Sequence, residues 1–446
     1  MQDAVGECHA TVPLRVVEPW QTRLTGPVTT AHRPRSAPVL TDVTEETSKD
    51  YLAAVMRGFH EEFNEQHWDF DRRLFEVDRC FGFTAGDRWI ATCGAFTRTM
   101  TTPGGSVPIG AVTVVTVAPT HRRQGLLTVM MRHQLADLHR RKEPVALLWA
   151  SESAIYGRFG YGSAVPRLWI SGRTSSTAFL PSVDLGDGWV EEVTKEEYGT
   201  VVPALHARLL PERPGALDRP AVFWERELLD RPEDRKGAPP VRYALHFGGT
   251  GELDGYTRFK VSAPWSGDLP DGEVAIEEID AVDAQARAGL WRFLFDLDLV
   301  RRFTSYGIAV DEPLRYLLAN PRILTTTLTD STYVRIVDLP KALANRRYGA
   351  DLDVVVQVSD HLLEHNDGTF RIQAEAGGEG ARVTRAGRRR PDLSLGIREL
   401  GSIYLGGTPL TSLHRAGLVS ERTPGSVAAM TMAFDWHQRP YCPDGF

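Results

Sequence analysis

Two adjacent arginines stand where an extended apolar run gives way to a segment with helical spacing. The run 112–118, VTVVTVA, is rich in β-branched residues, and Arg122-Arg123-Gln124-Gly125 then opens the next segment. The first turn of a helix presents unpaired N–H groups and the positive end of the helix dipole, which together stabilise a bound phosphate. Gly125 lacks a side chain that would block such an anion, and the arginines add positive charge. The pattern predicts a diphosphate-binding loop, although a strand-turn-helix with two solvated arginines would also explain it.

The surrounding elements must hold this loop in place. Runs of β-forming residues at Trp89–Met100 and Val107–Val117 predict two strands, and Thr102-Pro103-Gly104-Gly105 between them is typical of a hairpin. Apolar residues close to one face predict a helix from Gly125 to about Arg141, and Pro144–Trp149 reads as a short buried strand. The order strand, loop, helix, strand indicates an α/β core. Later segments also predict strands and helices, at Tyr243–Phe247, Gly255–Lys260, Glu273–Ile279, Asp283–Asp296, Tyr333–Val337, Asp353–Val358, Thr369–Ala374, Ile397–Leu405 and Pro409–Ala416.

The loop Arg122-Arg123-Gln124-Gly125-Leu126-Leu127 resembles the acyl-coenzyme A loop of the GNAT acetyltransferases, except that Leu127 replaces the usual small residue. Downstream, Tyr156-Gly157-Arg158-Phe159-Gly160-Tyr161 resembles a second motif of that fold, whose first tyrosine stands near the thioester sulfur. A phenol has a pKa near 10, so it is protonated at neutral pH and can donate to a departing thiolate. Tyr156 is therefore the candidate general acid, with a merely packed tyrosine as the alternative, and Tyr161 is expected in the core.

Two longer strings, APTHRRQGLL and ASESAIYGRFGYG, resemble the Eis family of acetyltransferases, and the resemblance extends over roughly residues 40 to 446. It implies an α/β (α+β) architecture of tandem GNAT-fold domains followed by a domain similar to sterol carrier proteins. We expect an irregular N-terminal arm (1–37), a first, catalytic domain (38–175), a central domain without a coenzyme loop (176–330) and a C-terminal domain (331–446). The central turn Ile279–Asp283 has neither an arginine pair nor a glycine.

The same resemblance implies roles for individual residues. The co-substrate would be acetyl-CoA, with Val115 and Val117 offering backbone groups to its pantetheine arm. Its pyrophosphate and neighbouring groups would be held by residues of the loop and of the following strand end: Arg122, Arg123, Gln124, Gly125, Leu126 and Ser151. The chain terminus would enter the active site, where the α-carboxylate of Phe446 serves as base. A carboxylate of pKa near 3.5 needs desolvation or a water relay for this task. The family's penultimate acidic residue is absent, because Gly445 stands there and Asp444 precedes it.

An acidic and aromatic stretch, 59–69, matches the part of the family that lines the acceptor pocket. Its carboxylates would attract a polycationic amine, and its aromatic rings could stack on the acceptor. The alternative is a solvated helix face with aromatic core anchors, on a helix expected between Glu45 and Glu65. The candidate acceptor residues are Phe59, Glu61, Glu62, Trp68 and, where several family members carry histidine, Trp149. Family members acetylate aminoglycosides and lysine side chains, and the sequence does not choose between them.

The amino-acid composition restricts the classes of partner and the location that we expect for this protein. The 446 residues carry 51 Lys plus Arg and 58 Asp plus Glu, a formal net charge of −7 that does not suit a nucleic-acid partner. The four cysteines form no CxxC pair, which fits a reducing cytoplasm, and no metal site is expected. No apolar run is long enough for a membrane span. We expect an N-acetyltransferase that forms a homohexamer, as the family does; the alternative is a non-catalytic protein that senses acyl-CoA or binds a lipid or protein partner.

Overall fold

The computed structural model describes residues 36–446, so all but the last two residues of the predicted N-terminal arm lie outside the described part. Residues 38–446 form one compact unit. Its main feature is a twelve-stranded sheet that the first and central domains share. In spatial order the strands are β1 (Val39–Asp42), β2 (Phe81–Ala85), β3 (Arg88–Thr102), β4 (Gly105–Val117), β5 (Val145–Trp149), β14 (Thr325–Ile336), β6 (Gly162–Arg173), β13 (Val300–Ile308), β12 (Gly272–Ala281), β9 (Leu253–Ser262), β8 (Val241–Phe247) and β7 (Trp189–Val193).

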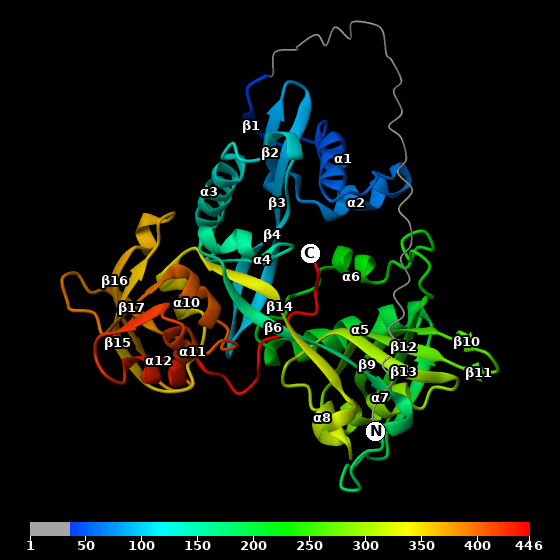
Figure 1. Ribbon diagram of the computed structural model, residues 1–446. Coiled ribbons are helices and arrows are strands. Elements are labelled where there is room, and N and C mark those ends of the chain that lie inside the picture. Colours follow the sequence, from blue (N-terminus) through cyan, green and yellow to red (C-terminus); the bar gives the residue numbers. More distant parts are fainter. Residues whose placement is uncertain (1–35) are drawn as a thin grey trace, which may run out of the picture. The chain divides into compact units, whose positions relative to one another are not determined.

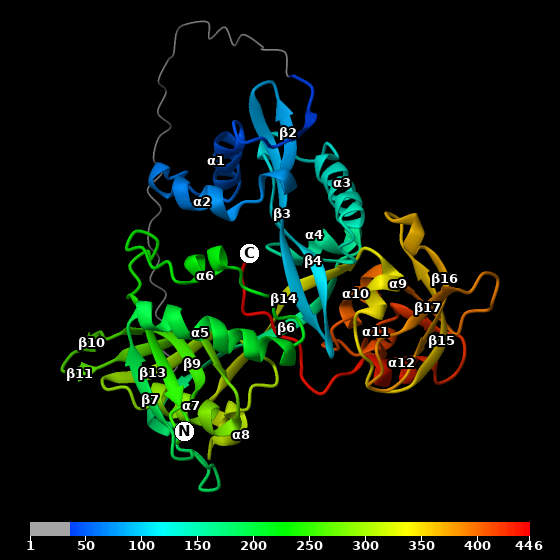
Figure 2. The same ribbon diagram turned by 180° about the vertical axis from the view of Figure 1, so that it is seen from behind.

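Strand β14 joins the two halves of this sheet (Figures 1 and 2). Its end, Thr332–Ile336, pairs antiparallel with β5, while Thr325–Val334 pairs antiparallel with β6. The first domain is thus completed by residues that follow the central domain in the sequence. The β3–β4 hairpin turns where predicted, with Thr102 opposite Gly105.

Four helices accompany the first half of the sheet: α1 (Ser48–Gly58), α2 (Trp68–Leu74), α3 (Leu126–Arg140) and α4 (Ser153–Tyr156). Helix α3 confirms the predicted segment. It buries Leu126, Met130, Leu135 and Leu138 against the sheet, because residues three to five positions apart share one face. The helix expected between Glu45 and Glu65 is shorter, ending at Gly58.

The central half carries α5 (Lys195–Leu209), α6 (Ala221–Glu227), α7 (Ala284–Phe295) and α8 (Leu314–Leu317), plus a small hairpin of β10 (Trp265–Ser266) and β11 (Leu269–Pro270). Helix α7 confirms the prediction for 283–296. Its fully buried Trp291 packs with Phe295 and Phe303 in the core of this half. The two halves therefore repeat a strand-turn-helix unit, β4–α3 and β12–α7.

The C-terminal domain has a sheet of its own, ordered β17 (Arg382–Arg385), β16 (Gly368–Ala374), β15 (Leu352–Ser359), β18 (Leu393–Gly396) and β19 (Val419–Glu421). Its helices are α9 (Leu339–Ala344), α10 (Ile397–Ile403), α11 (Leu410–Arg415) and α12 (Ser426–Phe434). The guanidinium of Arg346 lies in its interior, where it donates to the carbonyls of Tyr404 and Phe434. After α12 the chain, 435–446, returns to the other two domains as a tail (Figure 1).

Candidate active site

Strands β4 and β5 are paired over only part of their length, and they separate where the coenzyme arm is expected to lie. Their parallel pairing covers Ile109–Ala111 of β4 and Val145–Leu147 of β5. Beyond it, β4 contains a bulge at Val114, whose φ is 49° and where the register with β3 shifts. Val115 and Val117 follow the bulge on this parted stretch. Strand β5 does not pair with Val115 or Val117, and their pairing with an extended pantetheine stays a prediction.

The loop after β4 leaves a helix N-terminus open. The N-cap of α3 is Gly125, with a φ of 82° and no side-chain cap hydrogen bond, so the first-turn N–H groups lack a side-chain partner there. A Cβ added to Gly125 would meet nothing within 4 Å. Arg122, Arg123 and Gln124 are exposed, and neither arginine forms an ion pair within residues 36–446. This loop fits a diphosphate, because it offers N–H donors, free positive charge and space. Leu126 is buried in the core, so its contribution to a ligand would come from the backbone.

Tyr156 ends α4, and its ring lies 5.9 Å from that of Tyr161 in an edge-to-face contact. Burial, together with the smaller effects of Cys93 and Glu152, raises the pKa of Tyr156 to about 12. The phenol is therefore neutral and a donor throughout the physiological range. Tyr161 is fully buried, which confirms it as a core residue. Ser151 is exposed between β5 and α4.

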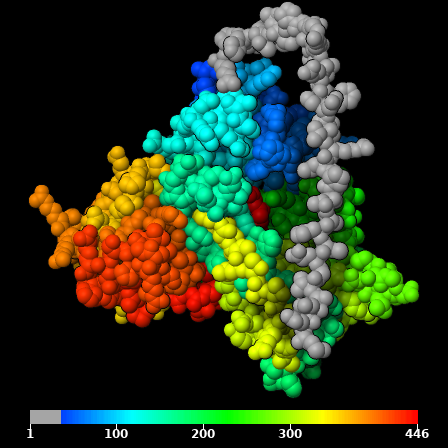
Figure 3. All heavy atoms as spheres, in the orientation of Figure 1, coloured from blue at the N-terminus to red at the C-terminus, as the bar shows by residue number. Residues whose placement is uncertain are grey.

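The C-terminal tail ends beside these elements. The carbonyl of Asp444 accepts a 2.8 Å hydrogen bond from the indole N–H of Trp149, the last residue of β5. The next carbonyl, of Gly445, accepts one of 2.8 Å from Arg226 of α6. Phe446 is partly buried against a core cluster that includes Phe96 and Phe223. Figure 1 and Figure 2 both show the terminus between α4 and α6, and in Figure 3 a small red area of the tail is visible between the blue and cyan first domain and the green central domain.

The candidate acceptor residues divide into two groups. A Cβ on Gly58 would lie 2.6 Å from Thr116, so the end of α1 rests on β4 just past the bulge. The next residue, Phe59, is 47% exposed, and Glu61 and Glu62 are exposed in the loop that follows. Trp68 instead packs, partly buried, with its ring centroid 6.3 Å from that of Phe63.

Trp149 makes contacts of a different kind from those expected. Its N–H is used by the tail, and the guanidinium of Arg167 lies 4.8 Å from its ring centroid. Sequence reasoning placed Trp149 in the acceptor pocket and did not single out Arg219 or Arg226, which also hold the tail. No local pattern marks these arginines, since their partners lie more than 200 positions away.

A metal site requires a cluster of ligand side chains, and a helix that crosses a membrane must be long and apolar. Residues 36–446 contain no group of three or more His, Cys, Asp or Glu side chains arranged to hold a metal ion. None of the helices in that range is long and apolar enough to cross a membrane.

Comparisons with known proteins agree with this geometry. Two family models, each described as an acetyltransferase (GNAT) domain, match residues 40–164 and 215–336, and a sterol carrier protein domain matches 339–443. These matches confirm the expected fold class, two GNAT domains followed by a sterol-carrier-like domain. A crystal structure of Eis1 from Mycobacterium abscessus superposes with a TM-score of 0.78 at 29% identity, covering 92% of this chain and 100% of that one.

Sequence relatives carry the same names. An uncharacterized N-acetyltransferase of Streptomyces avermitilis is 41% identical over 84% of this chain and 90% of its own length. The N-acetyltransferase Eis of Mycobacterium tuberculosis is 33% identical over 75% of this chain and 80% of its own. An acetyltransferase is thus supported over the non-catalytic alternative, and the fold implies acetyl-CoA as co-substrate. The chain is an N-acetyltransferase that belongs to the Eis family of GNAT proteins.

Proposed function

We propose that this enzyme transfers the acetyl group of acetyl-CoA to a primary amine of a polycationic acceptor, an aminoglycoside-like compound or a lysine side chain. The observation that carries the proposal is the convergence at the parted β4 and β5. The uncapped N-terminus of α3 follows β4, Tyr156 ends the short helix that follows β5, and the C-terminal tail binds Trp149 at the end of β5. Exposed Glu61 and Glu62 on the loop after α1 supply the charge that attracts a polycation.

The reaction is a direct attack within a ternary complex. The neutral amine nitrogen attacks the thioester carbonyl carbon, whose oxygen accepts from a backbone N–H near Val115. The C–N bond forms, the C–S bond breaks, and the sulfur leaves with its electron pair. The amine nitrogen releases one proton to the Phe446 carboxylate, directly or through water. The departing thiolate accepts a hydrogen bond from Tyr156 and takes its proton from solvent, and exchange with solvent restores the carboxylate.

The environment of Tyr156 sharpens its role. With a pKa of about 12, the phenol is a weaker acid than a thiol of pKa about 8.5. Complete proton transfer before C–S cleavage would therefore be unfavourable. Tyr156 acts by donating a hydrogen bond to the sulfur as negative charge develops, which is an interaction stronger in the transition state than in the ground state.

The place and assembly of the enzyme are also proposals. Cys80, Cys93 and Cys442 are all free and buried, which suits a reducing cytoplasm. Large apolar side chains are exposed on or near the shared sheet, among them Trp169, Tyr306 and Leu328. Such a patch favours contact between subunits, and the family resemblance is what suggests a homohexamer, a dimer of trimers. Sedimentation of the purified protein measures the assembly directly.

The test is thiol release from acetyl-CoA with a panel of aminoglycosides, polyamines and lysine peptides. We expect turnover with at least one polycation, and a kcat lower by about 100- to 1,000-fold in Tyr156→Phe. Binding of acetyl-CoA by the variant should stay within about threefold, since the phenol acts in the transition state. Acetyl-CoA binding without turnover on any amine would contradict the proposed acceptor class.

A second variant tests the terminal base. Extending the chain by Gly-Ser after Phe446 replaces the carboxylate by a peptide group at the same position. We expect kcat to fall by about 100-fold with unchanged acetyl-CoA affinity. An unchanged kcat would remove the terminal carboxylate from the mechanism.

A further inference from the structure

In the central domain, β12 and β13 stop pairing part-way along their length, as β4 and β5 do in the first domain. The C-terminal tail of the chain lies beside this point. Strands β12 and β13 pair in parallel from Gly272–Ile276 to Val300–Ser305, and beyond this stretch their pairing ends. The hydroxyl of Tyr441 donates 2.7 Å to the carbonyl of Gly307 in β13. Tyr441 and Pro443 line a small cavity of about 40 Å³ together with Ile276, Glu278, Ser305 and Gly307.

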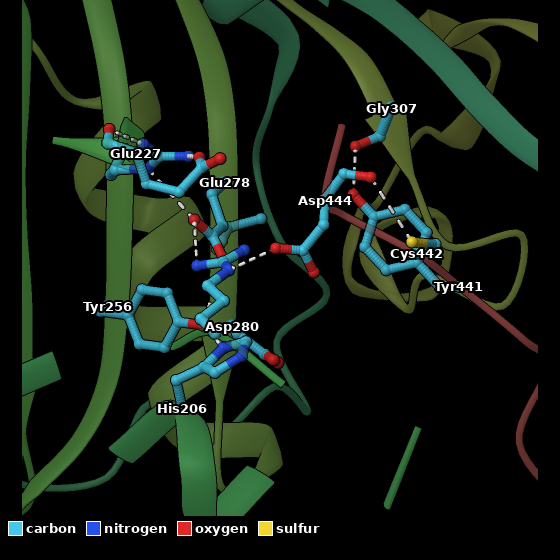
Figure 4. A network of polar contacts seen from close by, with 12 residues as sticks. His206, Glu227, Tyr256, Glu278, Asp280, Gly307, Tyr441, Cys442 and Asp444 are labelled. Carbon is cyan, nitrogen blue, oxygen red and sulfur yellow. Dashed lines mark hydrogen bonds and ion pairs between the residues drawn. The ribbon is translucent and has the colours of Figure 1, made fainter. Parts of the chain in front are cut away.

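A buried chain of charges ties the tail to the opposite strand, β12. The Asp444 carboxylate, 2% exposed, accepts a 2.6 Å hydrogen bond from Nε of Arg219. The other two nitrogens of Arg219 lie 2.9 and 3.3 Å from the carboxylate oxygens of Glu278. Figure 4 shows Asp444 and Glu278 reaching a shared guanidinium from two sides, with Tyr256 and His206 beneath.

The Glu278 carboxylate is held in the charged form. Burial alone would raise the pKa of Glu278, but Arg219 and Arg258 lower it to about 2. Arg258 in turn donates 2.8 Å to Glu227 at the end of α6. Burying ions is costly, and well-packed apolar side chains in their place often stabilise a protein as much or more. Such a network therefore calls for an explanation beyond stability.

The position of the network supplies that explanation. Asp444 precedes a glycine with open space around it, since a Cβ on Gly445 would meet nothing within 4 Å. The terminal carboxylate is two residues beyond Asp444, a reach of about 7 Å at most. Without a fixed Asp444, the hydrogen bond from Arg226 to the Gly445 carbonyl and the packing of Phe446 would be left to hold a flexible end.

We propose that Asp444, Arg219 and Glu278 form a latch of positioning residues that fixes the terminal carboxylate for acetyl transfer, beside the unpaired ends of β12 and β13 in the central domain. The latch rests on the proposed function of Phe446 as base. It also gives Asp444 a positioning role through Oδ1, which Arg219 engages, while Oδ2 is buried and has no hydrogen-bond partner within the described residues.

The first experiment measures the hold on the tail without turnover. Carboxypeptidase removes an accessible Phe446, and its release is followed by mass spectrometry in the full-length protein, Asp444→Asn and Glu278→Gln. We expect release at least about tenfold faster in both variants, because each loses one charge of the buried ion pairs. The matched control is Glu312→Gln, another buried acid of the central domain, which pairs with Arg287 and does not contact the tail. Its release rate should match that of the unchanged protein.

The second experiment links the latch to catalysis through a double-mutant cycle. Asp444→Asn should lower kcat by about 10- to 100-fold and leave the KM for acetyl-CoA within twofold, since a displaced base costs rate rather than coenzyme binding. Adding Gly-Ser after Phe446 in that variant should lower kcat by less than about threefold more, because both changes act on the same carboxylate. Melting temperatures identify variants that fail to fold, and Asp444→Glu, which keeps the charge, should recover part of the rate.

Two results would overturn the latch. Release of Phe446 no faster in Asp444→Asn than in Glu312→Gln would show that these ion pairs do not hold the tail. If the losses of kcat caused by Asp444→Asn and by the Gly-Ser extension multiply in the double variant, Asp444 does not act through the terminal carboxylate. Failure of the terminal base is recognised separately, by an extension that leaves the kcat of the otherwise unchanged protein intact; it would end the catalytic role of the latch, whatever the carboxypeptidase result.

Discussion

The same strand-turn-helix unit occurs twice in this enzyme, as β4–α3 and as β12–α7, and the two copies treat the helix N-terminus in opposite ways. Helix α3 begins at Gly125, with no side-chain cap and open space around it. Helix α7 begins at Asp283, whose carboxylate accepts a 2.9 Å hydrogen bond from the N–H of Ala286. The first arrangement leaves donors for an anion, while the second satisfies a donor internally and places negative charge where a phosphate would bind.

The difference extends to the residues around each turn. Arg122 and Arg123 precede α3, whereas Asp280 precedes α7 and accepts from the N–H of Ala281. Burial raises the pKa of Asp280, and Arg287 opposes that rise. A shared fold therefore does not imply a shared ligand, and we expect the few residues at each turn to decide whether a coenzyme binds there.

The largest effect is expected when an acidic N-cap like Asp283 of α7 is introduced at the N-terminus of α3. Gly125→Asp puts a carboxylate at the N-terminus of α3, and we expect the KM for acetyl-CoA to rise by about 100-fold or more through charge repulsion. Gly125→Asn has the same shape, tolerates positive φ and is neutral, so it separates charge from backbone strain. Equal effects of Asp and Asn in the acetyl-CoA titration would assign the loss to the backbone.

Removing one arginine should have a smaller effect of the same kind. Arg122→Ala or Arg123→Ala loses a charge-assisted contact to phosphate, so we expect roughly a tenfold higher KM for acetyl-CoA and little change in kcat. Acetyl-pantetheine, a thioester that lacks the diphosphate, provides the control. If the arginine substitutions weaken the use of acetyl-pantetheine by the same factor as that of acetyl-CoA, the arginines do not bind phosphate.

In the central turn the corresponding change should affect stability and leave acetyl-CoA kinetics untouched. Asp283→Ala removes a helix cap, with an expected loss of about 1 kcal/mol in the free energy of unfolding. Chemical denaturation and steady-state kinetics on the same preparation measure both. A raised KM for acetyl-CoA would contradict the assignment of this turn as one without a coenzyme.

The smallest expected effect concerns pH. Because burial raises the pKa of Tyr156 to about 12, its donor form is fully present below that value and is lost only as pH rises through it. We therefore expect Tyr156 to cause no fall in kcat/KM for acetyl-CoA, at saturating acceptor, between pH 8 and 10. Any fall in that range should also occur in Tyr156→Phe. A fall that is absent in Tyr156→Phe would place the pKa of Tyr156 near its ordinary value and weaken the case for a buried donor.

Much of the first domain could be predicted because its signals are local. The arginine loop, α3 and the β3–β4 hairpin each depend on residues within about fifteen positions, and all three stand where expected. Tyr156 and Tyr161 were assigned from a short motif and lie beside one another. Strands β6, β7 and β13 were not anticipated, since their alternation is weak and their pairing partners are distant in the chain.

The sequence by itself therefore determined the family, the loop before α3 and the short motif that contains Tyr156, since each depends on adjacent residues. Only the tertiary structure decided that β14 completes the first domain's sheet and that Trp149 and Arg219 hold the tail. The Trp149–Asp444 and Arg219–Asp444 contacts join residues 295 and 225 positions apart. No local pattern encodes contacts of that range, because they form only when packing brings three domains together and excludes water from the charges between them.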